Sequence, residues 1–362
     1  TTWTFSLAIL ILGLSAGFLG SFAEKIGPKK SGLLAMLFWV TGLLGTAYAL
    51  SIHNLTLLYL FYGIIGGIGL GIGYITPVST LVKYFPNRPG FATGLAIMGF
   101  GFASLIAGPL MQYLVAQVGL VDTFIILGVI YLVIMSASSL YLKAPQPKHP
   151  TRTTKDKSTM YVHTHGMLAN DAMKTWQFGA LWWVFFINIT CGIGLLSLAS
   201  PMAQEAIGMT PTAAASLVGI IGIFNGGGRI AWSTISDYLG RAQTYILFFI
   251  IQIIAFYLLA ETNSVLTFQI LILLIITCYG GGFSCMPAYL ADLYGIRQLS
   301  TIHGRILTAW GLAGIAGPML VSYFHEAGYG YTTALLCFAL LFVLNTIIAI
   351  ILKIYGKRGL HN

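Results

Sequence analysis

The side chain in this sequence with the clearest capacity for chemistry is Arg229. Of 18 Lys and Arg residues, it is the one that falls well inside a long apolar stretch. It precedes Asp237, at the polar end of that stretch, by eight residues, or about 12 Å along a helix. A planar guanidinium can donate two parallel hydrogen bonds to a carboxylate. Arg229 therefore predicts a binding site for a small organic anion.

A structural ion pair with a buried carboxylate is the alternative role for Arg229. The sequence holds 9 Asp and Glu residues. All of them lie in loops or at the ends of apolar stretches: Glu24, Asp122, Asp156, Asp171, Glu205, Asp237, Glu261, Asp292 and Glu326. An Arg at such a depth needs either a partner or a function. We therefore favour an anionic substrate as its partner.

Four aromatic side chains are expected at the same depth as Arg229. They lie nine or ten residues from the polar ends of their stretches, or about 13–15 Å along a helix: Tyr74, Phe100, Phe283 and Trp310. Together they could wall a cavity for a small acid with an apolar body. Ordinary helix packing is the alternative for each of them. Asn188, also inside a stretch, is expected either to bind substrate or to bond a neighbouring helix.

The sequence shows no pattern typical of a catalytic, metal-binding or nucleotide-binding site. There is no Ser, His and Asp grouping, no metal-ligand spacing and no phosphate-binding loop. The glycine run at residues 66–73 lies inside an apolar stretch with no strand before it, so it does not indicate a nucleotide site. We expect a protein that is not an enzyme and has no cofactor or metal. His303 begins an apolar stretch and is expected to be a hydrogen-bonded interface histidine rather than a proton carrier.

The elements that position these residues are expected to be membrane-spanning helices. Apolar residues make up 57% of the chain, charged residues only 7%, and the mean hydropathy is +0.87. Backbone groups in lipid must be satisfied internally, which favours helices for runs of this length. Eleven spans are predicted: Phe5–Phe22, Ser31–Ser51, Leu55–Val82, Gly90–Val115, Val121–Leu142, Trp176–Met202, Pro211–Ser236, Thr244–Ala260, Val265–Ala291, Thr301–Phe324 and Tyr331–Ile354. The four-residue spacing of Gly63, Gly67 and Gly71 predicts close helix packing.

Basic residues predict the orientation of these spans. Lys and Arg gather in alternate loops together with the polar stretch 143–175 and the C-terminus, and the opposite loops hold none. Positively charged loops face the cytoplasm, so we expect the linker and the C-terminus there, in a plasma or inner membrane. The net charge of +9 then faces anionic lipid, and a nucleic-acid partner is not expected.

Similar segments recur in the two parts of the chain. Residues 20–27 return as 233–240, and Ala107-Gly108-Pro109 returns as Ala316-Gly317-Pro318. This repetition predicts two parallel halves, an N-terminal half at 1–142 and a C-terminal half at 176–362, joined by a cytoplasmic linker at 143–175. Five spans precede the linker and six follow it. A first helix is therefore expected to be missing from this sequence.

The loop between the first two predicted spans resembles the signature loop of major facilitator transporters. The resemblance rests on Gly20, Glu24, Lys25 and Gly27, with an echo at Asp237 and Arg241. An acidic residue at one helix end and a cation on its neighbour can latch the cytoplasmic face, so these four charged residues are expected to gate transport. The pattern departs from the family at Pro28 and Tyr238, where basic residues are usual.

Further segments are similar to the oxalate/formate antiporter family within that superfamily. They are 73–77, 84–94, 177–182, 225–237 and 308–318, and the block from Asn225 to Asp237 is the most specific. The resemblance implies twelve helices and transport of small organic anions. It also implies a lysine in oxalate-handling relatives at the position that Ala313 occupies here.

We predict an all-α major facilitator fold that moves monocarboxylates such as formate, pyruvate or lactate by alternating access and anion exchange. Proton-coupled uptake, oxalate/formate exchange and a non-transporting sensor on the same fold are the alternatives. A carrier for sugars or drugs would usually place an acid inside the membrane, and none is predicted there. The expected partners are the carboxylate and the lipid bilayer, and the chain is expected to act as a monomer.

Overall fold

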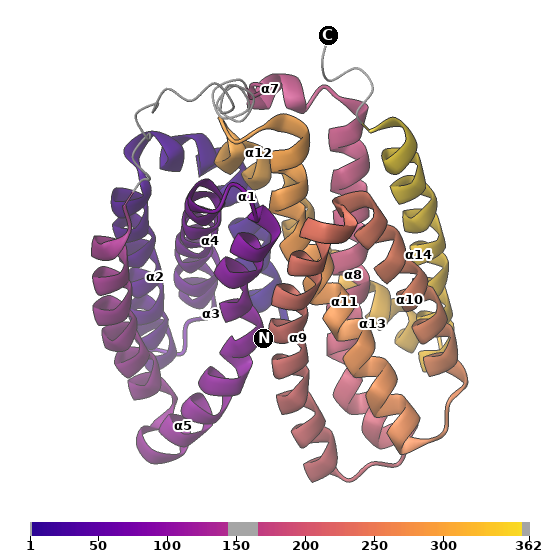
Figure 1. Cartoon of the computed structure of the whole chain (residues 1–362). Coiled ribbons are helices and arrows are strands. Elements are labelled where there is room, and N and C mark those ends of the chain that lie inside the picture. The colour runs from indigo at the N-terminus through magenta and orange to yellow at the C-terminus, as the bar shows by residue number, and fades with distance from the viewer. Residues whose placement is uncertain (1, 144–165, 357–362) are drawn as a thin grey trace, which may run out of the picture. The chain divides into compact units, whose positions relative to one another are not determined.

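The computed structural model describes residues 2–143 and 166–356, and this part of the chain is helical and contains no strand (Figure 1). The first elements are α1 (Thr2–Ile26), α2 (Pro28–Ser51), α3 (Leu55–Leu58), the π-helix η1 (Tyr59–Gly66), α4 (Gly67–Tyr84) and α5 (Pro89–Tyr141). After the gap follow α7 (Ala169–Ala172), α8 (Trp176–Glu205), α9 (Pro211–Leu239), α10 (Arg241–Glu261), α11 (Val265–Tyr294), α12 (Leu299–Ile306), α13 (Thr308–Glu326) and α14 (Gly330–Tyr355). Most of the predicted linker, residues 144–165, lies outside the described residues.

Helix boundaries follow from local residue chemistry. Pro28 and Pro211 begin α2 and α9 at positions where a missing N–H costs no hydrogen bond. The hydroxyl of Thr210 caps α9 by accepting a hydrogen bond from the backbone N–H of Ala213. The turn between α9 and α10 requires Gly240, whose φ of 92° is rarely adopted by other residues.

Ten helices in the described residues are long and apolar enough to cross a membrane. Eleven spans were predicted, and the difference lies in α5, which covers two of them. Its 53 residues are interrupted at Gly119, where φ is 81° and ψ is 174°. An unbroken helix of this length would be about 80 Å long, against a hydrocarbon core of about 30 Å. The break therefore separates the two predicted spans, Gly90–Val115 and Val121–Leu142.

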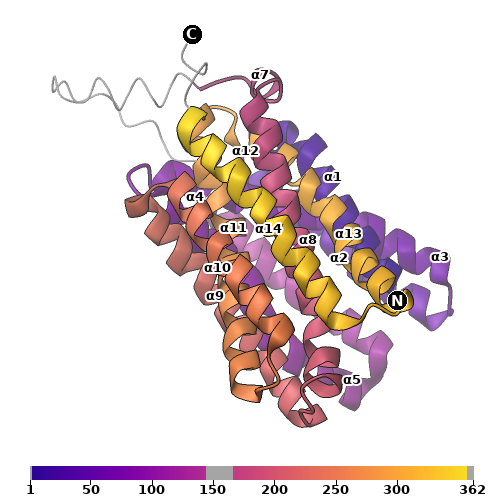
Figure 2. The same cartoon turned by 90° about the vertical axis from the view of Figure 1, so that its right-hand side faces the viewer.

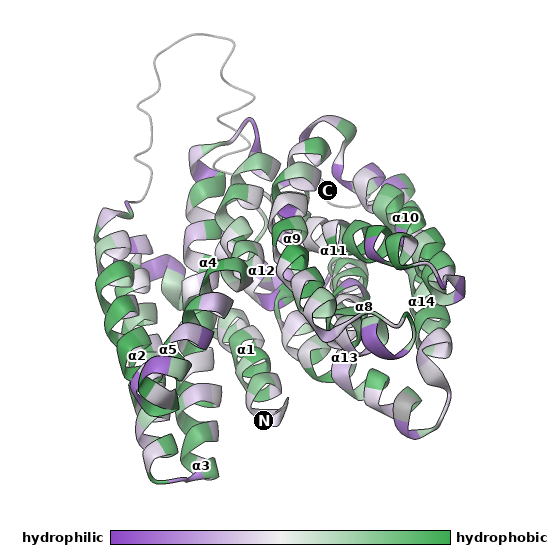
Figure 3. Ribbon diagram, turned by 90° about the horizontal axis from the view of Figure 1, so that it is seen from below, coloured by the Kyte–Doolittle hydropathy of each residue, from purple (hydrophilic) through white to green (hydrophobic). Residues whose placement is uncertain are grey.

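The outer faces of these helices are apolar, as expected for helices surrounded by lipid. Figure 3 shows hydrophobic residues along α2 and α10. Large apolar side chains such as Leu37, Ile254 and Leu340 are exposed. A water-facing surface would carry charge at such positions, so their exposure fits an integral, multi-pass membrane protein.

The helices form two compact units. The first unit contains residues 2–89, 111–143, 166–179 and 287–311, and the second contains 90–110, 180–286 and 312–356. In the second unit, α10 and α14 pack along each other (Figure 2). The boundaries of the two repeat-related halves stay a prediction.

Glycines allow close backbone contacts inside each unit. In the first unit, a Cβ atom on Gly67 would lie 2.9 Å from the carbonyl oxygen of Ala8, and one on Gly71 would lie 2.5 Å from that of Leu12. These contacts place α4 directly on α1 and confirm the close packing predicted for Gly67 and Gly71, whereas a Cβ on Gly63 would meet the side chain of Leu7.

A second glycine contact in the first unit joins α1 to α12, and we call it the α1–α12 seam. A Cβ on Gly13 would lie 2.6 Å from the carbonyl oxygen of Leu307, and one on Gly20 would lie 3.0 Å from that of Ser300. A Cβ on Gly304 would collide with the carbonyl oxygen of Ala16. The seam is therefore a contact of backbone on backbone.

Candidate substrate-binding site

Arg229 lies on α9 in the second unit and is 4% exposed. Its Nε donates to the Oδ1 of Asn225 at 3.1 Å, and its Nη1 donates to the carbonyl oxygen of Ile97 at 3.4 Å. Asn225 precedes Arg229 by one helical turn, so both side chains share a face of α9. These bonds set the orientation of the guanidinium plane.

The face of the Arg229 guanidinium lies over an aromatic ring. Its Cζ is 4.9 Å from the ring centroid of Phe283 on α11. Phe283 is buried and contacts Phe185 of α8, with 5.1 Å between ring centroids. A cation over a ring face is attracted by the ring quadrupole, and the contact excludes water from one side of the charge. The structure thus brings together two residues that the sequence predicted at one depth.

Asn188 is held by other polar groups of the second unit. Its amide nitrogen donates to the carbonyl oxygen of Tyr279 at 3.4 Å, and its Oδ1 accepts from Gln252 at 3.5 Å. Both bonds are long, but the side chain is fully buried. These contacts are the ones expected if Asn188 bonds neighbouring helices, and its role in substrate binding stays a prediction.

Phe100 also belongs to the second unit but is 42% exposed. Its neighbour Gly101 makes the close contact of α5 with α9, since a Cβ there would collide with Gly226. The structure therefore anchors the backbone beside Phe100 while its ring remains accessible. A place for Phe100 in the cavity wall stays a prediction.

Tyr74 and Trp310 contact each other in the first unit. Tyr74 lies on α4 and Trp310 on α13, with 5.4 Å between ring centroids in an edge-on arrangement. Both are buried. The tyrosine ring also contacts the imidazole of His303, with 5.8 Å between centroids. These two predicted wall residues are therefore neighbours.

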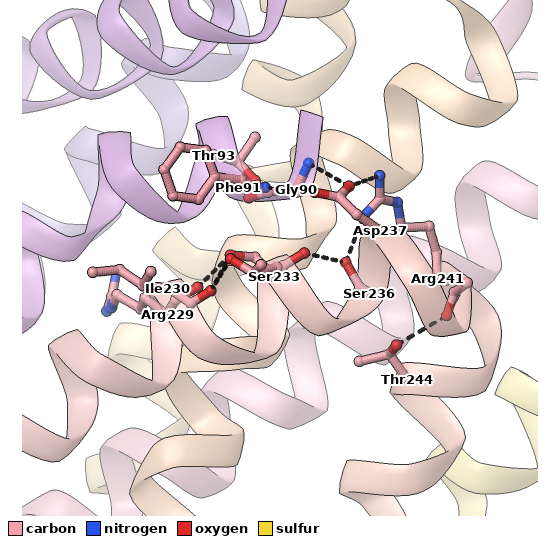
Figure 4. A network of polar contacts seen from close by, with 12 residues as sticks. Gly90, Phe91, Thr93, Arg229, Ile230, Ser233, Ser236, Asp237, Arg241 and Thr244 are labelled. Atoms are coloured by element: carbon pink, nitrogen blue, oxygen red, sulfur yellow. Dashed lines mark hydrogen bonds and ion pairs between the residues drawn. The ribbon is translucent and has the colours of Figure 1, made fainter. Parts of the chain in front are cut away.

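Asp237 forms the most connected of the predicted gate contacts (Figure 4). Its carboxylate accepts from the backbone N–H groups of Gly90 at 2.8 Å and Phe91 at 2.9 Å, in the first turn of α5. Arg241 donates to the same carboxylate at 2.6 Å and also to the hydroxyl of Ser236. The side chains of Asp237 and Arg241 are 6% and 7% exposed. An anion at a helix N-terminus satisfies free N–H groups and the positive end of the helix dipole.

Glu24 forms a different contact in the first unit. It accepts from Lys83 of α4 at 3.4 Å and from the hydroxyl of Thr301 of α12 at 3.2 Å. It lines a small polar pocket together with Lys83 and Ser300. Lys25 is exposed, so its role in the gate stays a prediction. Glu24 thus connects three helices.

Sequence reasoning missed Asn225 and Lys83. The first could have been found, because it lies four residues before Arg229 on a helix. Lys83 is distant from Glu24 in sequence, and only the packing of α4 on α1 brings them together.

The fold and these contacts define an all-helical, multi-pass membrane protein with a buried cation on one of its spanning helices. The model of the Major Facilitator Superfamily matches residues 1–318 and, in a second match, 181–359. The chain belongs to the major facilitator superfamily. It is therefore a membrane transporter rather than an enzyme.

The chain is also similar to individual transporters and to solved transporter structures. The chain is 30% identical over 317 residues to the uncharacterized MFS-type transporter YhjX of Escherichia coli K12, covering 86% of this chain and 76% of that protein. It is 26% identical over 325 residues to the oxalate:formate antiporter of Oxalobacter formigenes, covering 89% and 74%. The crystal structure of the transporter FucP in the outward conformation aligns with a TM-score of 0.70 at 17% identity, covering 96% and 87%. The predicted resemblance to the oxalate/formate antiporter family is thereby confirmed.

Proposed function

We propose that this transporter carries small monocarboxylates by exchange, with Arg229 binding the carboxylate. The observation that carries the proposal is a nearly buried guanidinium on a membrane-spanning helix. Burial of a charge in such a helix is unfavourable by about 2.5–3.5 kcal/mol even on the most lenient scale, so it is retained for a function. The similarity to an oxalate:formate antiporter supports a carboxylate as the cargo.

The geometry around Arg229 suits a carboxylate. Asn225 orients the guanidinium through Nε, and Phe283 covers one face of it. A carboxylate binds a guanidinium in its plane through paired hydrogen bonds. Lys has no such planar pair of donors.

A binding site built on one guanidinium favours a monoanion. Ala313 occupies the position where oxalate-handling relatives are expected to carry a lysine, and it is fully buried. One guanidinium balances one carboxylate, whereas a dianion would leave a second charge to be desolvated. Formate, pyruvate and lactate are the expected cargoes.

The positive charge of Arg229 also favours an exchange mechanism over net uptake. A bound monocarboxylate neutralises the guanidinium, and the sequence places every Asp and Glu in loops or at span ends. We therefore expect the return of the empty carrier, whose guanidinium holds no bound carboxylate, to be slower than the return of the loaded carrier.

Reconstituted vesicles test the proposal. Labelled formate, oxalate, pyruvate, lactate and acetate are offered with and without unlabelled anion inside. We expect monocarboxylate counterflow to be several-fold faster than uptake into empty vesicles, because each ~1.4 kcal/mol of extra barrier slows a step tenfold. Arg229→Gln should abolish carboxylate transport, and Arg229→Lys should retain little. The matched control Lys174→Gln, which removes an exposed charge, should transport normally.

Each alternative function has its own outcome in this assay. If the rate of uptake into empty vesicles under an inward proton gradient equals the rate of counterflow, the mechanism is proton-coupled uptake rather than exchange. If oxalate competes more tightly than any monocarboxylate, the function is oxalate/formate exchange. Carboxylate binding without flux would identify a sensor. Parental transport by Arg229→Gln would refute the site itself.

The remaining parts of the proposal concern the setting of the carrier. We place the linker and the C-terminus on the cytoplasmic side of a plasma or inner membrane and assign a monomer. The alternate basic loops support this sidedness. Labelling from each side of sealed vesicles tests it.

A further inference from the structure

His303 is a buried imidazole that the function above does not use. It lies on α12 and is 1% exposed, and its Nε2 has no hydrogen-bond partner among the described residues. Buried polar atoms are nearly always bonded. Leaving one unsatisfied is unfavourable by about 1–3 kcal/mol. The sequence predicted a hydrogen-bonded interface histidine, and the structure leaves this nitrogen without that bond.

Among the described residues, no carboxylate is hydrogen-bonded to Nε2 of His303. Its ring contact is Tyr74 of α4. The charged and titratable side chains on α12 and on α1, α4 and α7, which pack against it, are Glu24 and Lys25 of α1, Tyr74, Lys83 and Tyr84 of α4, Asp171 of α7 and Arg305 of α12.

Each acid in this set has another partner. Glu24 is bonded to Lys83 and Thr301, and Asp171 is bonded to Lys174. A protonated imidazole in this pocket would therefore be a buried charge without a bonded anion among the described residues, and such a charge is strongly unfavourable.

The residue that follows this imidazole in the chain belongs to the α1–α12 seam. Gly304, the next residue, meets the backbone of Ala16 so closely that no side chain fits between them. Ser300, one turn earlier, lies against Gly20. Water can reach His303 on this side only after α1 and α12 separate. A major facilitator transporter changes conformation during its cycle, so a glycine contact that can part is a suitable place for this opening.

We propose that His303 is a proton-binding site that controls the α1–α12 seam: it binds a proton when the seam opens and must release it before the seam closes. The ligand is the proton, and the site is independent of the cargo that Arg229 binds. Because the proton binds the open form, acid favours opening.

The expected size follows from an ordinary imidazole. With a reference pKa of about 6.5 in the open form and negligible proton binding in the closed form, the open population rises about tenfold between pH 8 and pH 5.5. This estimate holds while the open form is the minor one.

A cysteine placed in the seam measures this opening. Ser300→Cys is nearly isosteric and reports on a position that is 4% exposed. The rate of maleimide labelling of Ser300→Cys in detergent is divided by the rate for Ser51→Cys, an exposed site at the end of α2. Taking this ratio removes the pH dependence of the thiol reaction itself. Labelling of the chain without either cysteine is subtracted.

We expect this ratio to rise about tenfold from pH 8 to pH 5.5 in the parent. It should stay flat in His303→Gln, with His303→Asn as a second non-titrating variant and size-exclusion profiles confirming that both are folded. His53→Gln, which removes an exposed histidine from the loop after α2, should rise like the parent. A flat ratio in the parent, or an equal rise in His303→Gln, would overturn the proposal.

Discussion

Substituting Asp237 with Asn tests whether the contact between α9 and α5 stabilises the observed state. The change keeps the shape of the side chain and removes its charge. One carboxylate oxygen becomes an amide nitrogen, which cannot accept from Gly90 or Phe91. Arg241 loses its ion-pair partner while remaining buried.

The magnitude follows from burial. Because both side chains are less than a tenth exposed, breaking the pair is expected to be unfavourable by about 3–5 kcal/mol. The carboxylate also interacts with the helix N-terminus of α5, worth about 0.3–1 kcal/mol. The terms overlap, and we expect a total loss of about 3 kcal/mol, which is more than a hundredfold in an equilibrium constant.

Reversible denaturant unfolding in mixed micelles measures this loss, and a double-mutant cycle with Arg241→Gln isolates the pair. The coupling free energy should exceed about 1.5 kcal/mol. The control Asp171→Asn breaks an ion pair at 3.3 Å whose side chains are 54% and 78% exposed, so its effect should stay below about 1 kcal/mol. Equal losses for Asp237→Asn and Asp171→Asn, or additive effects in the cycle, would refute the reasoning.

Two further substitutions test the cargo site. Ala313→Lys adds a second cation three residues after Trp310 and should shift selectivity from monocarboxylates toward oxalate by about tenfold or more in competition assays. Parental selectivity in this variant would contradict the argument from charge balance. Asn188→Leu should lower stability by about 0.6 kcal/mol and by no more than about 1.7 kcal/mol, the average and the maximum for hydrogen bonds between membrane helices, with the KM for the cargo unchanged. A raised KM at parental stability would instead assign Asn188 to substrate binding.

Much of the fold could be predicted from the sequence, because the signal for a membrane helix is local. An apolar run long enough to cross the bilayer has no alternative to helical structure, so the spans were found within a few residues of their observed bounds. The same reasoning located Arg229, since one charge in an apolar run is visible without knowing what surrounds it. The glycine spacing in α4 likewise predicted a close contact from one helix alone.

Only the tertiary structure decided which side chains meet. Glu24 pairs with Lys83 rather than with a residue of its own loop, Asp237 caps α5, and Tyr74 lies against His303. These partners are separated by many residues in the chain, and their contacts depend on helix rotation and on where glycines let backbones touch. Periodicity along one helix carries no information about the helix beside it. The orphaned nitrogen of His303 could therefore appear only after the helices were packed.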